Sequence, residues 1–242
     1  EFYQLDIEMS FVTQDDVFAV VEEVLHSTFA AFSQKAVDAT PWRRIPYREA
    51  MLKYGSDKPD LRIPIEMVDV SGIFRDSAFN AFAGAVQAGA VVRAIPVKGI
   101  KEKPRSFFDK LVDHAKGIGA KGLAYLVWDG AAVKGPIQKF LKPEELAALA
   151  AAGGMADGDI LFLVCDEPAK AARIGGELRL KLGRDLGLIE PDVFRFCWIV
   201  DFPMYEKDPE TGATVFSHNP FSMPQGGMEA LQTQDPLDIL AY

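Results

Sequence analysis

Residues 1–11 alternate between apolar and polar side chains with the period of a β-strand. One side of such a strand would carry Phe2, Gln4, Asp6 and Glu8: an aromatic ring, an amide and two carboxylates, spaced about 6–7 Å apart. The other side would carry large apolar residues: Tyr3, Leu5, Ile7, Met9 and Phe11. Because the polar side has no Lys or Arg, we predict a central antiparallel strand whose polar side lines a pocket; an ordinary half-exposed strand is equally compatible with the pattern.

The composition is typical of a globular protein. The chain has 242 residues, of which 49% are hydrophobic and 25% charged, enough for one large or two ordinary domains. No apolar run reaches the ~18–20 residues of a membrane span, and we expect no membrane contact. The net charge of −9 argues against a nucleic-acid-binding chain, since phosphates are bound by clustered Lys and Arg.

Both ends of the sequence lie inside predicted segments, so we expect a piece of a longer protein.

Cys165 and Cys197 stand in apolar runs and are predicted to be buried free thiols of a cytoplasmic protein. The three histidines are scattered and form no zinc motif, so no metal site is predicted.

The region after the first strand contains clear helix signals. Residues 13–16 resemble a capping box, and apolar residues at helical spacing extend the predicted helix to about residue 33. Residues 41–46 should be extended because of their prolines, and a short helix over 47–54 should end at Gly55. The loop 55–62 alternates in charge, which fits a solvated turn or a loop that presents Asp57 and Lys58 to a ligand.

The middle of the chain alternates between strands and helices, which predicts a self-contained α/β unit. The expected strands are 91–97, 123–128 and 160–165, the last buried on both faces, and the expected helices are 106–116, 143–152 and 170–182. Lys98, Lys101, Lys103 and Arg105 form the one basic cluster, which fits a solvated loop or an RNA contact.

The last part of the chain predicts a hairpin. A buried strand over 196–200 is followed by a turn over 207–213 and a returning strand over 214–219. Asp201 and His218 stand at strand ends, where they could line the rim of a pocket. Residues 228–241 predict a broken helix.

Several segments resemble one family in the order of the chain. Residues 1–11 resemble the second half of motif 2 of a class II aminoacyl-tRNA synthetase of the bacterial aspartyl type. Three further segments resemble the same family, namely 54–62 (YGSDKPDLR), 198–203 (WIVDFP) and 218–221 (HNPF). Residues 119–125 and 178–187 resemble the GAD domain that is inserted in these enzymes and shared with the B subunit of tRNA-dependent amidotransferases.

The resemblance implies an α+β fold in which an incomplete class II antiparallel sheet with its helices is interrupted by an inserted α/β domain. Residues 1–66 would be the first part of the catalytic domain, 67–190 the GAD-like insertion, and 191–242 the second catalytic part with His218. The alternative is a non-catalytic module, related to the amidotransferase subunit, that binds tRNA or protein; the strand over 1–11 argues against it.

The resemblance also implies a reaction and roles for the residues named first. The enzyme would activate L-aspartate with ATP to aspartyl-adenylate and transfer the aspartyl group to the 3′ end of tRNA(Asp). The sequence is equally compatible with an enzyme specific for tRNA(Asp) and with one that also charges tRNA(Asn). Phe2 and Gln4 would bind ATP, Asp6 and His218 would bind aspartate, and Glu8 would support its neighbours. The loop of Ser56, Asp57 and Lys58 would lie near the active site without supplying assigned ligands. No residue of the chain is assigned as catalytic.

Other parts of the family pattern are missing from the sequence, including the acids that bind Mg²⁺, motif 1 of the homodimer interface and the barrel that reads the anticodon. An acidic chain is therefore compatible with a cytoplasmic tRNA-binding enzyme, with no role for DNA. Asn219 stands where many relatives have a second histidine. We expect the chain by itself to be inactive.

Overall fold

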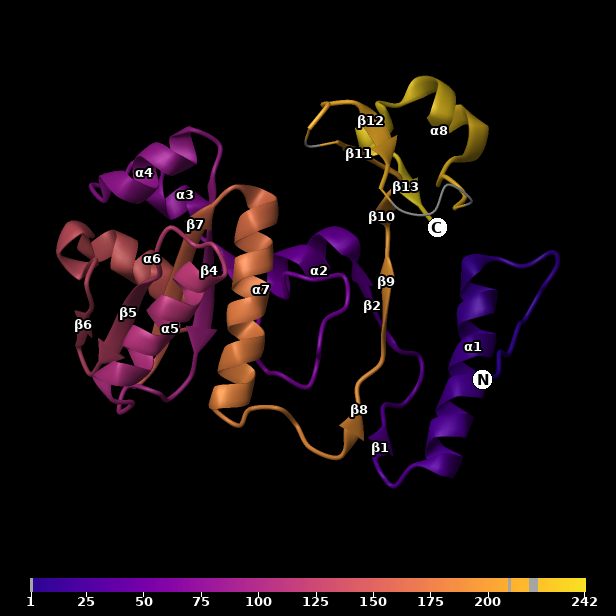
Figure 1. The fold of residues 1–242 in the computed structure, drawn as a ribbon, viewed down its shortest axis with the longest axis horizontal. Helices are drawn as coiled ribbons and strands as arrows, with labels where there is room; N and C mark the ends of the chain where they lie inside the picture. The colour runs from indigo at the N-terminus through magenta and orange to yellow at the C-terminus, as the bar shows by residue number, and fades with distance from the viewer. Residues whose placement is uncertain (1, 209, 218–221) are drawn as a thin grey trace. The chain divides into compact units, whose positions relative to one another are not determined.

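The computed structural model describes residues 2–208, 210–217 and 222–242 (Figure 1). The chain divides into two compact units. Unit 1 consists of Glu1–Tyr47 and Glu190–Tyr242, and unit 2 consists of Arg48–Ile189. With its mixture of helices and largely antiparallel sheet, the fold is α+β.

Unit 2 is built on a five-stranded sheet with the strand order β3-β4-β7-β5-β6. Every neighbouring pair in this sheet is antiparallel. The strands are β3 (Val68–Asp69), β4 (Val91–Val97), β5 (Ala124–Asp129), β6 (Ala132–Lys134) and β7 (Ile160–Asp166). The central strand β7 is buried along almost its whole length, which confirms the prediction that both of its faces are covered.

Helices cover both faces of this sheet. α5 (Arg105–Gly117) and α7 (Pro168–Asp185) pack on one face, around a core that includes Leu111 and Leu178. The other face is covered by α3 (Ser71–Phe74), α4 (Asn80–Gln87) and α6 (Pro143–Gly153). The predicted strands and helices of the middle region are therefore confirmed, with shifts of at most three residues at their ends.

Unit 2 begins earlier in the chain than the α/β region recognised in the sequence. It includes most of α2 (Tyr47–Lys53) and the segment that follows, and Gly55 has the positive φ of +68° expected just past a helix end. This segment belongs to unit 2 because it packs on α7. The proposed domain limits of 67–190 stay a prediction.

One buried arginine holds that segment on α7. Arg179 is only 1% exposed. Its Nε donates to the carbonyl oxygen of Ile65 at 2.6 Å, and its Nη2 donates to those of Asp60 and Ile63, both at 2.8 Å. Its guanidinium also lies 4.9 Å from the centre of the Tyr54 ring. Burial lowers the pKa of Arg179, whereas Tyr54, Asp60 and Glu66 act to raise it.

Two glycines of α7 allow this close approach. A Cβ on Gly176 would lie 2.8 Å from the carbonyl oxygen of Tyr54, and one on Gly183 would lie 2.6 Å from Cδ1 of Ile63. Gly176, Arg179 and Gly183 follow one another at spacings of three and four residues, so they share one face of the helix. This face of α7 is shaped to receive the backbone of the segment after α2.

Acidic residues pair with Lys98 and Lys101, two of the four residues of the basic cluster of unit 2. Lys98 Nζ lies 3.0 Å from Oδ2 of Asp159, and Lys101 Nζ contacts both Asp129 and Asp157, at 3.2 and 2.9 Å. The amides of Gly99 and Ala156 also donate to Asp159, which is 4% exposed. Burial alone would raise the pKa of Asp159, but these two amides and Lys98 hold it below the ordinary value. Lys98 and Lys101 are thus part of the fold; the two interpretations of the cluster, a solvated loop or an RNA contact, stay predictions.

Unit 1 is organised around α1 (Gln14–Phe32), which begins with the predicted capping box: the amide of Thr13 donates to Asp16, and the amide of Asp16 donates to Oγ1 of Thr13. Among the residues described in unit 1, the strands form two-stranded ladders. Two are parallel: β1 (Ala36–Val37) with β8 (Val193–Phe194), and β2 (Arg43–Pro46) with β9 (Cys197–Val200). Two are antiparallel: β10 (Phe202–Pro203) with β13 (Leu240–Ala241), and β11 (Tyr205–Lys207) with β12 (Thr214–Phe216).

The ladder of β11 and β12 confirms the predicted hairpin and its turn. The predicted strand over 196–200 is β9, which pairs with β2 and not with the returning strand. The broken helix at the end of the chain is also confirmed, as α8 (Gly227–Thr233) followed by the short 3₁₀ helix Pro236–Asp238.

A buried carboxylate links α1 to β2 and β9. Glu22 is 4% exposed, and its Oε1 accepts hydrogen bonds from the amide of Trp42 at 3.2 Å and from the indole Nε1 of Trp198 at 2.8 Å. Aromatic rings stack beside it, Phe18 on Trp198 and Trp42 on Phe196. The sequence pattern predicts α1 as a helix with a broad apolar face, but only Phe18 and Glu22 of α1 are buried.

The predicted strand over residues 1–11 is not formed. Residues 2–9 are neither helix nor strand, and all of them are exposed. A strand requires partners for its backbone N–H and C=O groups, and no described strand pairs with this segment. The prediction of a central strand is therefore wrong for this chain. The alternation shows which face of a strand could be buried, but it does not show whether a neighbouring strand is present to pair with it.

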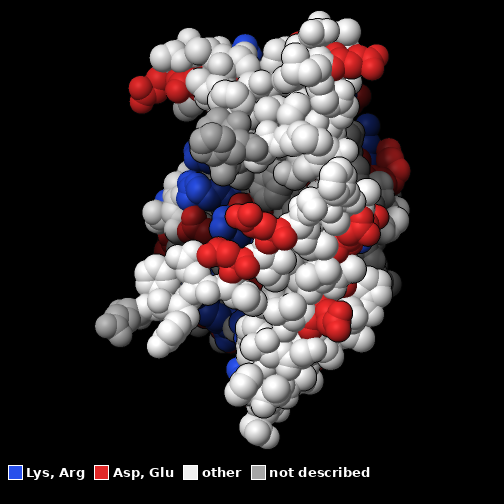
Figure 2. Space-filling view, turned by 90° about the vertical axis from the view of Figure 1, so that its right-hand side faces the viewer, with Lys and Arg blue, Asp and Glu red and all other residues white. Residues whose placement is uncertain are grey.

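Unit 1 carries most of the exposed apolar surface. Of the large hydrophobic residues exposed in the described parts of the chain, only Phe140 and Leu180 belong to unit 2. Figure 2, which views the right-hand side of Figure 1, shows broad uncharged areas between separate acidic and basic groups. This surface fits a unit that packs against further elements.

Cys165 and Cys197 are free, as predicted, but each is half-buried where the sequence predicts full burial. Burial raises the pKa of both thiols. Within the described ranges, no helix is both long and apolar enough to cross a lipid bilayer.

Replacing Arg179 with Met should lower the free energy of unfolding of unit 2 by about 3 kcal/mol, because three buried carbonyl oxygens lose their donor. Arg184→Met, at an exposed position of the same helix, should cost less than about 1 kcal/mol. Urea unfolding followed by circular dichroism measures both. Equal losses for the two variants would show that the bonds of Arg179 contribute nothing specific.

The depressed pKa of Asp159 predicts an acid-sensitive fold. A carboxylate whose pKa is lower in the folded state stabilises above its unfolded pKa, near 3.9, and this stability is lost as the pH falls through the folded value. Asp159→Asn should therefore unfold more easily at pH 7 and lose less further stability between pH 5 and pH 2 than the unaltered chain. Asp113→Asn, at an exposed position of α5, is the control. Parallel pH profiles for Asp159→Asn and the unaltered chain would contradict the prediction.

Candidate functional site

Three of the four residues predicted to bind ATP and aspartate lie exposed in the first segment. Phe2 is 83% exposed, and Gln4, Asp6 and Glu8 are exposed as well. Within the described ranges, no hydrogen bond or ion pair fixes the carboxylates of Asp6 and Glu8. His218 and Asn219 lie outside the described residues. The convergence of Phe2, Gln4, Asp6 and His218 in one pocket therefore stays a prediction.

Asp201, predicted at a pocket rim, lies between β9 and β10 in a left-handed backbone conformation with φ of +57°. Its Oδ1 accepts a hydrogen bond from Nε2 of Gln225 at 2.9 Å. Gln225 is itself held at β13, since its backbone N–H donates to the carbonyl oxygen of Leu240 at 2.8 Å and its Nε2 donates to that of Ala241 at 3.3 Å. A non-glycine residue persists in this conformation when its surroundings fix it, as Gln225 does here. Gln225 carries no sequence signal that marks this role, because it stands in an irregular Pro- and Gly-rich loop.

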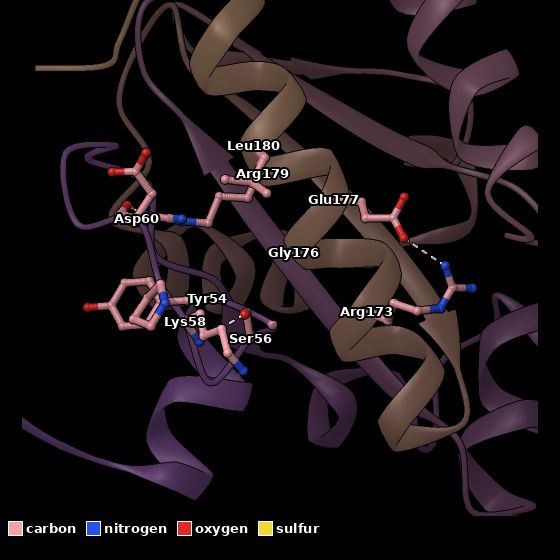
Figure 3. Close-up of a pocket in the computed structure, with 11 residues that line it drawn as sticks. Tyr54, Ser56, Lys58, Asp60, Arg173, Gly176, Glu177, Arg179 and Leu180 are labelled. Carbon is pink, nitrogen blue, oxygen red and sulfur yellow. Dashed lines mark hydrogen bonds and ion pairs between the residues drawn. The ribbon is translucent and has the colours of Figure 1, made fainter. Parts of the chain in front are cut away.

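A cavity of about 180 Å³ lies in unit 2 between the loop after α2 and helix α7 (Figure 3). The loop contributes Tyr54, Gly55, Ser56, Lys58, Pro59 and Asp60, and the helix contributes Arg173, Gly176, Glu177, Arg179 and Leu180. Figure 3 shows Tyr54, Ser56, Lys58 and Asp60 on one side of α7, while Arg173 and Glu177 point toward the other side. The floor is formed by Gly55 against Gly176, where a Cβ on Gly55 would lie 2.7 Å from the amide nitrogen of Gly176.

The charges of this loop are mostly neutralised by one another. Lys58 Nζ lies 2.7 Å from Oδ2 of Asp57, and the amide of Lys58 donates to Oγ of Ser56 at 3.0 Å. Arg62 binds Asp60 through two donors, at 2.9 and 2.8 Å. These bonds hold the pKa of Asp60 below its ordinary value, against the opposing effect of burial.

Lys58 is the exposed charge of the loop, with 84% of its side chain accessible. The cavity therefore offers an exposed ammonium and a hydroxyl beside a rigid floor, and its lining includes no His or Cys that could act as a general base or nucleophile. Of the two interpretations of this loop, the geometry fits a solvated turn on a fixed base. It assigns no ligand to Asp57 or Lys58.

The sequence interpretation did not single out the residues that give this site its shape. Gly176 is one of two adjacent glycines in α7, and Arg179 follows it at helical spacing. This spacing is the signal that could have indicated a close backbone contact. Across residues 2–208, 210–217 and 222–242, no group of three or more His, Cys, Asp or Glu residues is arranged to hold a metal ion.

Comparison with known proteins gives one consistent result. The family model for tRNA synthetases class II (D, K and N) matches residues 1–241. A protein of Acidiphilium cryptum is 57% identical over the whole of this chain, one of Paramagnetospirillum magneticum is 56% identical, and one of Rickettsia felis is 51% identical. Each of the three is named Aspartate--tRNA(Asp/Asn) ligase.

The chain spans only part of these relatives, namely 41% of the Acidiphilium and Rickettsia proteins and 28% of the Paramagnetospirillum protein. The family match, in contrast, extends over nearly all of the chain, from the exposed first segment through unit 2 to β13. By this match, the chain belongs to the class II tRNA synthetases of the D, K and N group.

Proposed function

We propose that this chain is part of an aspartate–tRNA ligase that charges both tRNA(Asp) and tRNA(Asn). The observation that carries the proposal is the identity of 51–57%, over the whole chain, to proteins named Aspartate--tRNA(Asp/Asn) ligase. A module related to the amidotransferase subunit would share only the middle region, so matches that extend over both units do not support that alternative.

The reaction has two steps. The α-carboxylate of aspartate attacks the α-phosphorus of ATP, which forms aspartyl-adenylate and releases pyrophosphate. A ribose hydroxyl at the 3′ end of the tRNA then attacks the activated carbonyl and releases AMP. In the whole enzyme Mg²⁺ would neutralise the phosphates; the described residues offer no cluster of ligands for it, so its ligands would come from elsewhere in the protein.

Four residues would bind the substrates. Phe2 would stack on the adenine ring and Gln4 would hydrogen-bond near the nucleotide. Asp6 would pair with the ammonium group of aspartate, with Glu8 in support. An ion pair at 4 Å is worth about 4 kcal/mol at an effective dielectric constant of ~20, so Asp6 can contribute strongly to affinity. His218 would contact the side-chain carboxylate of aspartate.

This arrangement requires residues 2–9 to be a strand. In this chain they are exposed and pair with no strand, although their apolar and polar side chains alternate with the period of a strand. We propose that strands of the longer protein pair with this segment and so align Phe2, Gln4 and Asp6 on one side. The longer protein would be a homodimer of the cytoplasm, and unit 2 would contain its GAD-like insertion.

The 242-residue chain alone should not catalyse ATP–pyrophosphate exchange in the presence of aspartate, because the segment that would bind ATP is not folded into a strand. The full-length protein should catalyse it. The measurement is the incorporation of labelled pyrophosphate into ATP, with the full-length protein as positive control. Exchange by the chain alone above the rate without aspartate would refute the expected inactivity, whereas failure of the full-length protein would refute the proposed function.

In the full-length protein, Asp6→Asn should raise the KM for aspartate about 100-fold, equivalent to about 3 kcal/mol, and leave the KM for ATP nearly unchanged. Phe2→Ala should have the opposite effect, with a raised KM for ATP only. Glu210→Gln, in the exposed turn between β11 and β12, is the matched control and should change neither constant. An Asp6→Asn variant with an unchanged KM for aspartate would remove Asp6 from the site.

A further inference from the structure

The segment that joins β12 to α8, residues 217–226, carries His218, and its first residue is fixed at the end of β10. The backbone N–H of Ser217 donates to the carbonyl oxygen of Met204 at 3.1 Å, and the Ser217 hydroxyl donates to the carbonyl oxygen of Pro203. Pro203 is the last residue of β10, and Met204 follows it. His218 itself lies outside the described residues, but the residue that precedes it is held at one place on the ladder.

The last residues of this segment are fixed on β13, the strand that pairs with β10 (Figure 1). The carbonyl oxygen of Met223 accepts a hydrogen bond from the backbone N–H of Tyr242 at 3.0 Å, and Pro224 forms an antiparallel bridge with Ala241. Both ends of the segment are therefore attached to the same two-stranded ladder, one end to each of its strands.

One pair of side chains connects the two points of attachment. The Nε2 of Gln225 donates to Oδ1 of Asp201 at 2.9 Å and to the carbonyl oxygen of Ala241 at 3.3 Å. Both of these partners are acceptors, so the nitrogen of the Gln225 amide and not its oxygen must face them. Asp201 directly precedes β10, so the Gln225 side chain connects the end of the segment at β13 to the start of β10. Both residues are half-buried, where a hydrogen bond is stronger than in water.

The backbone at Asp201 limits which residues can supply this acceptor. Its φ of +57° lies in the left-handed region, which Gly adopts without strain and which Asn and Asp adopt more readily than other residues do. Asn would keep both the conformation and the Oδ1 acceptor, whereas Gly would keep the conformation and remove the acceptor. The backbone contribution of Asp201 can therefore be separated from the contribution of its hydrogen bond.

We propose that Asp201 and Gln225 are positioning residues for the substrate aspartate. Their hydrogen bond holds the end of the segment at a fixed place relative to its start at Ser217, and this sets the position of His218. This role rests on the proposed function, in which His218 contacts the side-chain carboxylate of aspartate. Neither Asp201 nor Gln225 would touch the substrate.

Loss of this bond should affect the binding of aspartate and not that of ATP. A displacement of about 1 Å at a group that orients the substrate can cost about 100-fold in rate. The residues proposed to bind ATP, Phe2 and Gln4, stand on the first segment and not on residues 217–226. A merely structural role would instead weaken the binding of both substrates, because it would disturb the site as a whole.

Steady-state ATP–pyrophosphate exchange by the full-length protein tests this role. Gln225→Met keeps the length of the side chain but removes its donors, and should raise the KM for aspartate about tenfold while the KM for ATP stays within about twofold. Asp201→Gly should give the same result, because it removes the acceptor of the same bond. Asp201→Asn should keep the KM for aspartate within about threefold of that of the unaltered protein. Gln232→Met, the same substitution at an exposed position of α8, is the matched control and should change neither constant.

A double variant distinguishes one shared bond from two separate defects. If Asp201 and Gln225 act through their mutual hydrogen bond, the protein with both Asp201→Gly and Gln225→Met should show no higher KM for aspartate than either single variant. The melting temperature of each variant shows whether it is folded. Should Gln225→Met fail to fold, the contrast between Asp201→Gly and Asp201→Asn decides the question.

Three results would overturn the proposed role. These are an unchanged KM for aspartate in folded Gln225→Met and Asp201→Gly variants, equal increases in the KM values for aspartate and ATP, and multiplied effects in the double variant. Absence of exchange by the unaltered full-length protein would instead refute the proposed function, and this role with it.

Discussion

The guanidinium of Arg179 satisfies three carbonyl oxygens of a segment that has no regular hydrogen bonds of its own, and the shape of unit 2 depends on this contact. Backbone carbonyls buried without donors are unfavourable, so a loop can lie on a helix only where the helix supplies donors. Inside a helix the backbone N–H groups already donate to the helix's own carbonyl oxygens, so they cannot serve as these donors. A long, always-charged side chain solves the problem, while Gly176 and Gly183 bring the backbones close enough for it to reach. The YGSDKPDLR loop is therefore held on a rigid base.

This contact also shows where sequence interpretation succeeds and fails. The capping box at Thr13 and the turn at Gly55 were predictable because their physical causes lie within a few residues. The strands and helices of unit 2 were predictable from their periodicity, and the hairpin from its turn residues. The partners of Arg179, in contrast, lie 114 to 119 residues away, and Glu22 is bound by an indole 176 residues away. No local pattern marks such pairs, and Glu22 looks like any polar residue of a helix.

The first segment illustrates a different limit. Its alternation predicts that Tyr3, Leu5 and Ile7 would share a face if a strand formed. Strand formation, however, depends on a neighbouring strand, and the pattern does not show whether one is present. The site residues Phe2, Gln4 and Asp6 are therefore predictable only as a set with a common orientation. Tyr3 and Leu5 are exposed for the same reason, since without a paired strand they have no core to pack on.

Charge has to be considered unit by unit for the same reason. The net charge of −9 argues against a nucleic-acid partner only if the charge is spread over the whole chain, yet the acidic excess lies in unit 1. Unit 2 pairs most of its basic residues with acidic neighbours, as Lys98 and Lys101 show. The pairing of these charges is thus part of the fold of unit 2 and not evidence about partners. Among the described residues of unit 1, ion pairs are formed by Asp15, Asp38 and Glu190. The negative net charge of the chain is therefore a property of unit 1 and says nothing about the partners of unit 2.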